Sequence, residues 1–200
     1  MLQNLNFSTK NNILFKIYCE WIKFKQKMDQ LIYFERKKKY DTEHAEKVRV
    51  KHLKNKLNTT EKMELYNSGI SGDIAKLQEL IEVKKYPLME ECSASGYYWT
   101  VLHYAAHYGN VKIIEFILDF YKFDQDKLDI VNLQSNLGLS PLLIAINAVS
   151  AEKKKQIIDL YIKYDAIDFS VCSKDNNEDI FDICKKHNLL EYLLSNLKED

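Results

Sequence analysis

Apolar residues recur at helical spacing near the start of the chain. Between residues 11 and 39 they follow one another at intervals of three and four, and no Gly or Pro interrupts them. This pattern predicts one long amphipathic helix. A more polar helical stretch follows from about Asp41 to Leu57, and Asn58-Thr59-Thr60 is typical of a helix break and a new cap. The apolar stripe of the first helix consists of Leu14, Ile17, Trp21, Phe24, Met28, Leu31 and Ile32.

This stripe is too apolar to remain in water. Burying one aliphatic or aromatic side chain is worth roughly 1.5–3 kcal/mol, and seven exposed together exceed the apolar patch of an ordinary monomer. The stripe packs either on the protein's own helical stack or on another polypeptide or a membrane surface, and we favour the second reading. We therefore expect partner binding through Leu14, Ile17, Trp21, Phe24, Met28 and Leu31.

From about residue 60 the apolar stretches become shorter, come in pairs, and repeat. A small residue recurs at Ser68, Ala105, Ala145 and Cys184, at spacings of 37, 40 and 39. Such a position allows helices to pack closely, and the spacing predicts four units of two helices each. Side chains that favour helix N-caps precede the first helices (Thr100, Ser140, Asp179) and the second helices (Asp73, Asn110, Ser150, Asn188).

The best-defined unit is TVLHYAAHYGN, from Thr100 to Asn110, followed by an apolar second helix. It resembles the ankyrin repeat, whose first helix opens T-P-L-H-x-A-A, with Val101 in place of the proline. Ser140-Pro141 opens another copy, in which about four extra residues fall between Asn147 and Gln156; the copies at either end are degenerate.

The resemblance covers about residues 60–197. It implies an all-α, ankyrin-like helical-repeat solenoid of about four repeats with an N-terminal helical extension. The domains are then a basic, aromatic-rich docking arm at 1–58 and a repeat domain at 59–200. Because the spacings exceed the ~33 residues of a standard unit, we expect residues 82–99 and 119–139 to form long connecting fingers.

Charge also divides the chain in two. The 200 residues contain 29 basic and 29 acidic side chains, yet residues 1–60 carry a net +8 and residues 61–200 a net −8. Peripheral contact with an anionic membrane or an acidic protein is one reading of Arg36, Lys37, Lys38 and Lys39. Nucleic acid is a weaker candidate, because Glu43 and Glu46 follow closely. No apolar run reaches the ~20 residues of a transmembrane span.

The motifs of known chemistries are absent from the sequence. It has no Gly-rich phosphate-binding loop and no C-x-x-C pair, and its four cysteines are dispersed, which favours a reducing, intracellular compartment. His103 and His107 lie four apart, but no Glu follows His103, and the resemblance implies that His103 ties neighbouring turns together. We expect no enzyme, no cofactor and no metal; an enzyme with a site in the long fingers is the weakest alternative.

The resemblance also implies where a partner binds, namely at the finger tips and the exposed positions of the first helices. The aromatic run Tyr97–Trp99 is the best candidate hot spot, although we expect one of its three rings to pack beneath the finger. The predicted partner-binding residues are Tyr97, Tyr98, Trp99, His107, Tyr108, Leu137 and Leu139, with Asn136, Asn147 and Ala148 at corresponding positions.

The sequence thus predicts a non-catalytic scaffold, an accessory subunit held in a large multiprotein assembly through its arm and fingers. The first acidic residue is Glu20, and the lysine-bearing amphipathic start resembles a mitochondrial presequence. That likeness would place the assembly in a mitochondrion, as part of a respiratory-chain complex. The alternative is a free cytosolic or cytoskeletal adaptor that binds a single client.

Overall fold

The computed structural model describes residues 57–92, 97–124, 126–169 and 171–197. The predicted docking arm lies outside these residues, except for its last two positions, so its apolar stripe and its basic run stay predictions. Within the described ranges all regular structure is helical, which confirms the expected fold class. The helices are α3 (Thr59–Ser71), α4 (Ile74–Glu82), α5 (Val101–Tyr108), α6 (Val111–Tyr121), α7 (Lys127–Val131), α8 (Pro141–Ala148), α9 (Ala151–Lys163), α10 (Ile180–Lys186) and α11 (Leu190–Asn196).

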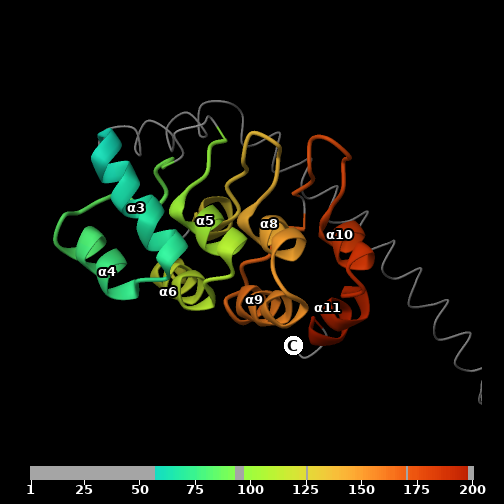
Figure 1. The fold of residues 1–200 in the computed structure, drawn as a ribbon. Helices are drawn as coiled ribbons and strands as arrows, with labels where there is room; N and C mark the ends of the chain where they lie inside the picture. The colour runs from blue at the N-terminus through green and yellow to red at the C-terminus, as the bar shows by residue number, and fades with distance from the viewer. Residues whose placement is uncertain (1–56, 93–96, 125, 170, 198–200) are drawn as a thin grey trace, which may run out of the picture. The chain divides into compact units, whose positions relative to one another are not determined.

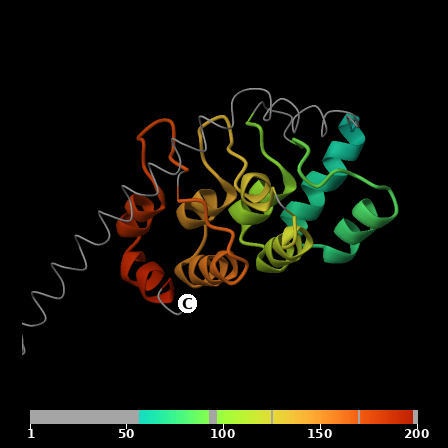
Figure 2. The ribbon, with the colours of Figure 1, turned by 180° about the vertical axis from the view of Figure 1, so that it is seen from behind.

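Eight of these helices form two parallel rows (Figures 1 and 2). The first row contains α3, α5, α8 and α10, and the second contains α4, α6, α9 and α11, with contacts between neighbours along and across the rows. Repeat 1 is therefore α3–α4, repeat 2 is α5–α6, repeat 3 is α8–α9 and repeat 4 is α10–α11. The short α7 packs against α6 within a connection that we expected to be a long finger.

The first helices begin where the polar caps predict. Ser140 and Asp179 accept hydrogen bonds from the backbone N–H three residues ahead, at 3.4 and 2.9 Å. The Thr100 N–H donates to His103 Nδ1 at 3.1 Å. Asn188 does not cap α11: it adopts φ +56°, and Leu189 takes the N-cap position. The left-handed turn that ends α10 is the conformation for which Asn is suited.

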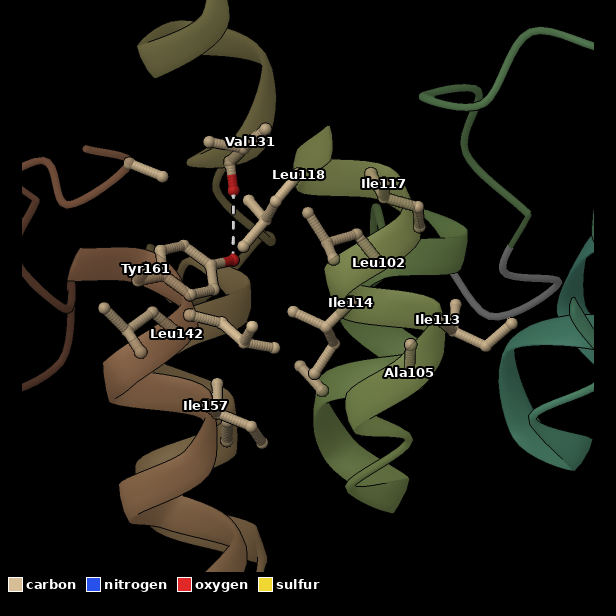
Figure 3. Packing of buried hydrophobic residues seen from close by; sticks show 14 of the residues in the cluster. Leu102, Ala105, Ile113, Ile114, Ile117, Leu118, Val131, Leu142, Ile157 and Tyr161 are labelled. Carbon is tan, nitrogen blue, oxygen red and sulfur yellow. Dashed lines mark hydrogen bonds between the residues drawn. The ribbon is translucent and has the colours of Figure 1, made fainter. Parts of the chain in front are cut away.

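Close packing across the repeats involves the predicted small residues. Ser68, Ala105, Ala145 and Cys184 are all buried, at 0–1% exposure. Because these side chains are short, the backbones of successive first helices can approach one another. Figure 3 shows apolar side chains of α5 and α6 facing those of α8 and α9, with the Tyr161 hydroxyl 3.5 Å from the Val131 carbonyl.

Repeat 3 departs from the predicted loop. Only Val149 and Ser150 separate α8 from α9, the same two-residue turn that separates α5 from α6. The four extra residues therefore form an additional first turn of α9, Ala151–Lys154, and not a longer connection. Lys and Ala favour helix, and the segment has no Gly or Pro.

The extra turn contacts both neighbouring repeats. On one side, Lys153 Cδ lies 2.7 Å from where a Cβ on Gly109 would stand, so it covers the turn of repeat 2. On the other side, Lys154 Nζ lies 3.1 Å from His187 Nδ1 of repeat 4. One added helical turn thus links three repeats.

Candidate protein interface

Three finger tips lie on one side of the helix rows, at residues 97–100, 132–140 and 171–179 (Figure 1). Neighbouring fingers are joined by backbone hydrogen bonds. The Asn136 N–H donates to the Tyr97 carbonyl at 3.0 Å, and the Lys174 N–H donates to the Leu137 carbonyl at 2.9 Å. The predicted binding residues of different repeats are therefore held side by side at the finger tips.

Aromatic rings extend from the first finger along α5. Ring centroids lie 6.3 Å apart for Tyr97 and Trp99, 5.3 Å for Trp99 and His107, and 5.1 Å for His107 and Tyr108. Tyr97, Tyr98 and Tyr108 are each about half exposed, at 49%, 54% and 47%. These five residues, Tyr97, Tyr98, Trp99, His107 and Tyr108, form what we call the aromatic surface.

Trp99 is the half-buried member of the run from Tyr97 to Trp99. Its ring packs on α5, 5.0 Å from the Tyr104 ring and 6.2 Å from His103. Trp99 thus anchors the aromatic surface to the first helix of repeat 2. One of the three rings was expected to be covered, although beneath the finger; it packs on the helix instead.

Tyr98 has an unusual backbone conformation. Its φ is +57°, at the finger position where the next two fingers have Gly138 at +77° and Asn177 at +53°. Gly and Asn tolerate left-handed backbone, whereas a bulky aromatic residue adopts it at a cost of roughly 1–2 kcal/mol. A large, exposed, strained side chain at a position that suits Gly is a feature that occurs at functional sites.

The two predicted leucines differ. Leu137 is 42% exposed at the tip of the second finger, next to Tyr97 in the hydrogen-bonded ladder. Leu139 is partly buried and packs against the core, so only Leu137 extends the surface. Asn147 and Ala148, which continue the first-helix positions in repeat 3, are exposed.

His103 lies beneath the aromatic surface. Its ring is fully buried, and Nδ1 contacts the Thr100 hydroxyl at 2.9 Å. Burial lowers its pKa to about 4, because the nearby carbonyls of Leu133 and Leu139 only partly offset desolvation of the charged ring. Nε2 is buried without a hydrogen bond of good geometry. His103 ties α5 to its own cap through Nδ1. The expected tie to the neighbouring turn is represented by the Leu133 and Leu139 carbonyls of the next finger, which lie near the ring.

Two features of the described residues concern metal binding and thiol chemistry. They contain no group of three or more His, Cys, Asp or Glu side chains that could hold a metal ion. Cys92 and Cys184 are buried, and burial raises the pKa of each thiol to about 12, which makes both poor nucleophiles. None of the described helices is long and apolar enough to span a bilayer.

Sequence reasoning missed a second exposed apolar group. Val83, Phe120 and Phe123, at the ends of α4 and α6, are 74%, 52% and 89% exposed. The repeat pattern treats apolar residues near the end of a second helix as core. The available signal was position for Phe123, which lies beyond the end of α6 at Tyr121. Phe120 follows Ile113 and Ile117 at helical spacing, so the pattern alone does not mark it as exposed.

Comparison with known proteins agrees with the geometry. The ankyrin repeat family matches residues 97–127, which contain the end of the first finger, α5 and α6. This is the repeat that carries the aromatic surface. The sequence has no significant match among curated proteins. The family match at repeat 2, with paired helices stacked before and after it, supports the identification of the chain as an ankyrin-repeat protein.

Proposed function

We propose that the chain is a non-catalytic protein-binding subunit that presents the aromatic surface to a partner. The observation that carries this proposal is Tyr98, an exposed aromatic residue kept at φ +57° where Gly138 and Asn177 occupy the other fingers. Tyr and Trp dominate the binding energy of protein interfaces. The Tyr98 ring is present although its backbone conformation costs free energy, which supports a role in binding a partner and not in stabilising the fold.

The surface also indicates the chemistry of the partner. Its tyrosine, tryptophan and histidine side chains adjoin Leu137 and include no carboxylate or ammonium group. Such a surface matches apolar and aromatic side chains with a few polar groups, which the tyrosine hydroxyls can satisfy. The partner segment over these fingers is therefore expected to be predominantly apolar.

The finer proposal concerns the setting. The basic arm at 1–58 serves as a second attachment, so that the chain is an accessory subunit of a large assembly. The presequence-like start supports a mitochondrial location, in a respiratory-chain complex. The family resemblance alone names no assembly, because one fold hosts many functions.

Substitutions on two faces test the binding surface. Full-length chain is isolated gently from its native source, and the proteins that co-purify are quantified against Tyr98→Asn, Trp99→Ala and Phe123→Ala variants. We expect Tyr98→Asn and Trp99→Ala to reduce partner recovery at least tenfold. Phe123→Ala, a matched aromatic truncation just after α6 and outside the aromatic surface, should leave it unchanged. Loss with Phe123→Ala alone would contradict the proposal.

The arm requires a separate measurement. Deletion of residues 1–40 should release the protein from a large particle in sedimentation. A full-length chain that sediments as a monomer in a gentle extract would favour the single-client adaptor instead. Respiratory-complex fractions that lack the chain would exclude membership of a respiratory-chain complex.

A further inference from the structure

A chain of polar side chains joins repeats 3 and 4. Lys154, in the extra turn of α9, places Nζ 3.1 Å from His187 Nδ1. The other ring nitrogen, Nε2, lies 3.1 Å from Asn147 Oδ1 on α8. His187 itself caps the C-terminus of α10. The ring is therefore held between two helices of the preceding repeat.

The hydrogen bonds determine which nitrogen of the His187 ring carries the proton. Asn147 Nδ2 donates to the Leu143 carbonyl at 3.0 Å, which turns the amide oxygen toward His187. Nε2 must then carry the hydrogen that this oxygen accepts. Nδ1 is left with a lone pair, which accepts from the Lys154 ammonium. The arrangement is satisfied only by a neutral imidazole.

The surroundings disfavour a second positive charge. Lys154 is only 9% exposed, and its ammonium depends on an acceptor. The pKa of His187 is lowered from its ordinary 6.5, first by burial and then by the charges of Lys154 and Lys186. Lys186 is itself paired with Glu178.

Charged groups on the neighbouring helices do not reverse this balance. Helix α8 has no ionisable residue. In α9, Asp159 accepts the hydrogen bond of the Tyr192 hydroxyl at 2.7 Å, Lys155 lies over the Tyr192 ring, and Glu152 is exposed. The carboxylate of α11, Glu191, is also exposed. The charges that act on the ring are thus the two lysines.

We propose that Lys154, His187 and Asn147 form a pH-sensitive latch that fastens repeat 4 to repeat 3 and opens on acidification. Protonation of His187 puts a cation against Lys154 and removes the acceptor of its ammonium. Among the described helices, α10 packs on α8 and α11 packs on α9 of repeat 3, so the opening stays local. It loosens α10 and α11 and shortens the ordered stack.

The sign of the effect follows from proton uptake. Above pH 6.5 the ring is neutral in both the closed and the open state. Below 6.5 the open state binds the proton first, so each opening takes up one proton. The opening constant then rises by at most tenfold per pH unit, until the closed state also becomes protonated.

Hydrogen exchange on the full-length chain tests the latch. Amide protection in α10 and α11 is followed from pH 7.5 to 5.5 and corrected for the intrinsic exchange rate. We expect protection to fall by several-fold per pH unit below 6.5. The slope should vanish in His187→Gln, which cannot titrate, and persist in His107→Gln, a matched change of an exposed histidine on α5.

A ring titration supplies an independent readout. In an NMR titration of the wild-type protein, His187 should titrate below 6.5, and Lys154→Met should raise its pKa because the neighbouring charge is removed. A wild-type His187 pKa of 6.5 or higher would overturn the proposal even if His187→Gln failed to fold. An unchanged pH slope in a folded His187→Gln variant would overturn it as well.

Discussion

His103 and Tyr98 lie five residues apart and pose opposite physical problems. His103 is a polar ring in a fully buried place, where it stays neutral. Tyr98 is an aromatic ring in a solvent-facing place, with a backbone conformation that aromatic residues rarely adopt. The neutral, buried ring of His103 makes the stability of the fold depend on pH. The positive φ of Tyr98 lowers the stability of the fold and leaves an aromatic side chain exposed.

Acid should destabilise the repeats through His103. Its pKa is about 4 in the folded chain against 6.5 ordinarily, so the unfolded chain binds the proton first as the pH falls below 6.5. The free energy of unfolding should drop by up to about 3 kcal/mol as the pH approaches 4. Urea denaturation at pH 7 and pH 4.5 measures this loss.

The control for this prediction is His103→Gln. Carboxylates also take up protons near pH 4.5, so the informative quantity is the difference between the two proteins. The variant should be less stable at pH 7 but show a flatter dependence on pH. Parallel curves would contradict the assignment of a neutral, buried ring.

Relief of strain should make Tyr98→Asn a stabilising substitution. Asn adopts left-handed backbone readily, as Asn177 does in the third finger. We expect the free energy of unfolding to rise by up to about 1 kcal/mol. Tyr97→Asn is the matched control: it removes a similarly exposed ring without a positive φ and should give no gain. A destabilised Tyr98→Asn protein would mean that the ring supports the fold.

Individual residues could be predicted where the reason is local. Thr100, Ser140 and Asp179 precede apolar helices and occupy N-caps, because a cap needs only its own next turn. The φ of Tyr98 could not be predicted, since it depends on how the finger closes. His187 and Lys154 lie 33 residues apart, and only the stacking of repeats brings them together.

At the scale of elements, two asparagines join separate segments of the stack. Asn110 Nδ2 donates to the carbonyls of Gly69 and Ile70 at the end of α3, at 2.5 and 2.8 Å. Asn132 Nδ2 donates to the Leu128 and Ala166 carbonyls, at 2.9 and 2.8 Å. Carbonyls at helix ends lack partners within their helix, so the two amides satisfy the Gly69, Ile70 and Ala166 carbonyls from a neighbouring element.

Removing one such amide should weaken the stack. Asn110→Ala leaves the Gly69 and Ile70 carbonyls without this donor, and an unsatisfied, partly buried group costs about 1–3 kcal/mol. Chemical denaturation should show a loss in this range. Asn196→Ala, which removes a single local bond near the end of α11, should cost about 0.5 kcal/mol or less. Equal losses of stability in Asn110→Ala and Asn196→Ala would indicate that the hydrogen bonds between repeats stabilise the protein no more than a local bond within one helix.

The sequence predicted the helices better than the connections. Apolar spacing and caps located all eight stacked helices, whereas the added residues of repeat 3 were assigned to a turn and form the start of α9. Four residues added to a turn and four added to a helix lengthen the repeat by the same amount, so the spacing of the repeats does not distinguish them. Likewise, α7 has only five residues, too few for a periodic pattern.

The four described repeats form a linear array, since each repeat packs mainly on its neighbours. Central and terminal positions should therefore respond differently to the same loss of packing. Ile114 in α6 and Leu193 in α11 are both fully buried, so either alanine substitution removes about 2–5 kcal/mol locally.

Ile114→Ala should lower the thermal midpoint of the entire stack, because repeat 2 supports repeats on both sides. Leu193→Ala should unfold repeat 4 early and leave the main transition nearly unchanged. Calorimetry together with hydrogen exchange of α5 and α6 distinguishes the two outcomes. Identical shifts of one transition would show that the array unfolds as a single unit.

For the stack as a whole, the repeat pattern predicted how the paired helices are arranged, because each repeat has similar apolar spacing and helix caps. The placement of the predicted binding residues followed from the register of the fingers, with Leu139 as the exception that packs inward. Partner identity does not follow from the pattern, since exposed positions can vary without affecting the helices behind them. The setting of the protein therefore stays a proposal.

The added turn of α9 has a mechanical consequence. Lys153 lies over the turn of repeat 2 while Lys154 contacts His187 of repeat 4, so bending at either junction between repeats would have to break a side-chain contact. A ligand that fits the stack as it stands loses little entropy in ordering its receptor, whereas one that requires the repeats to bend must first break these contacts.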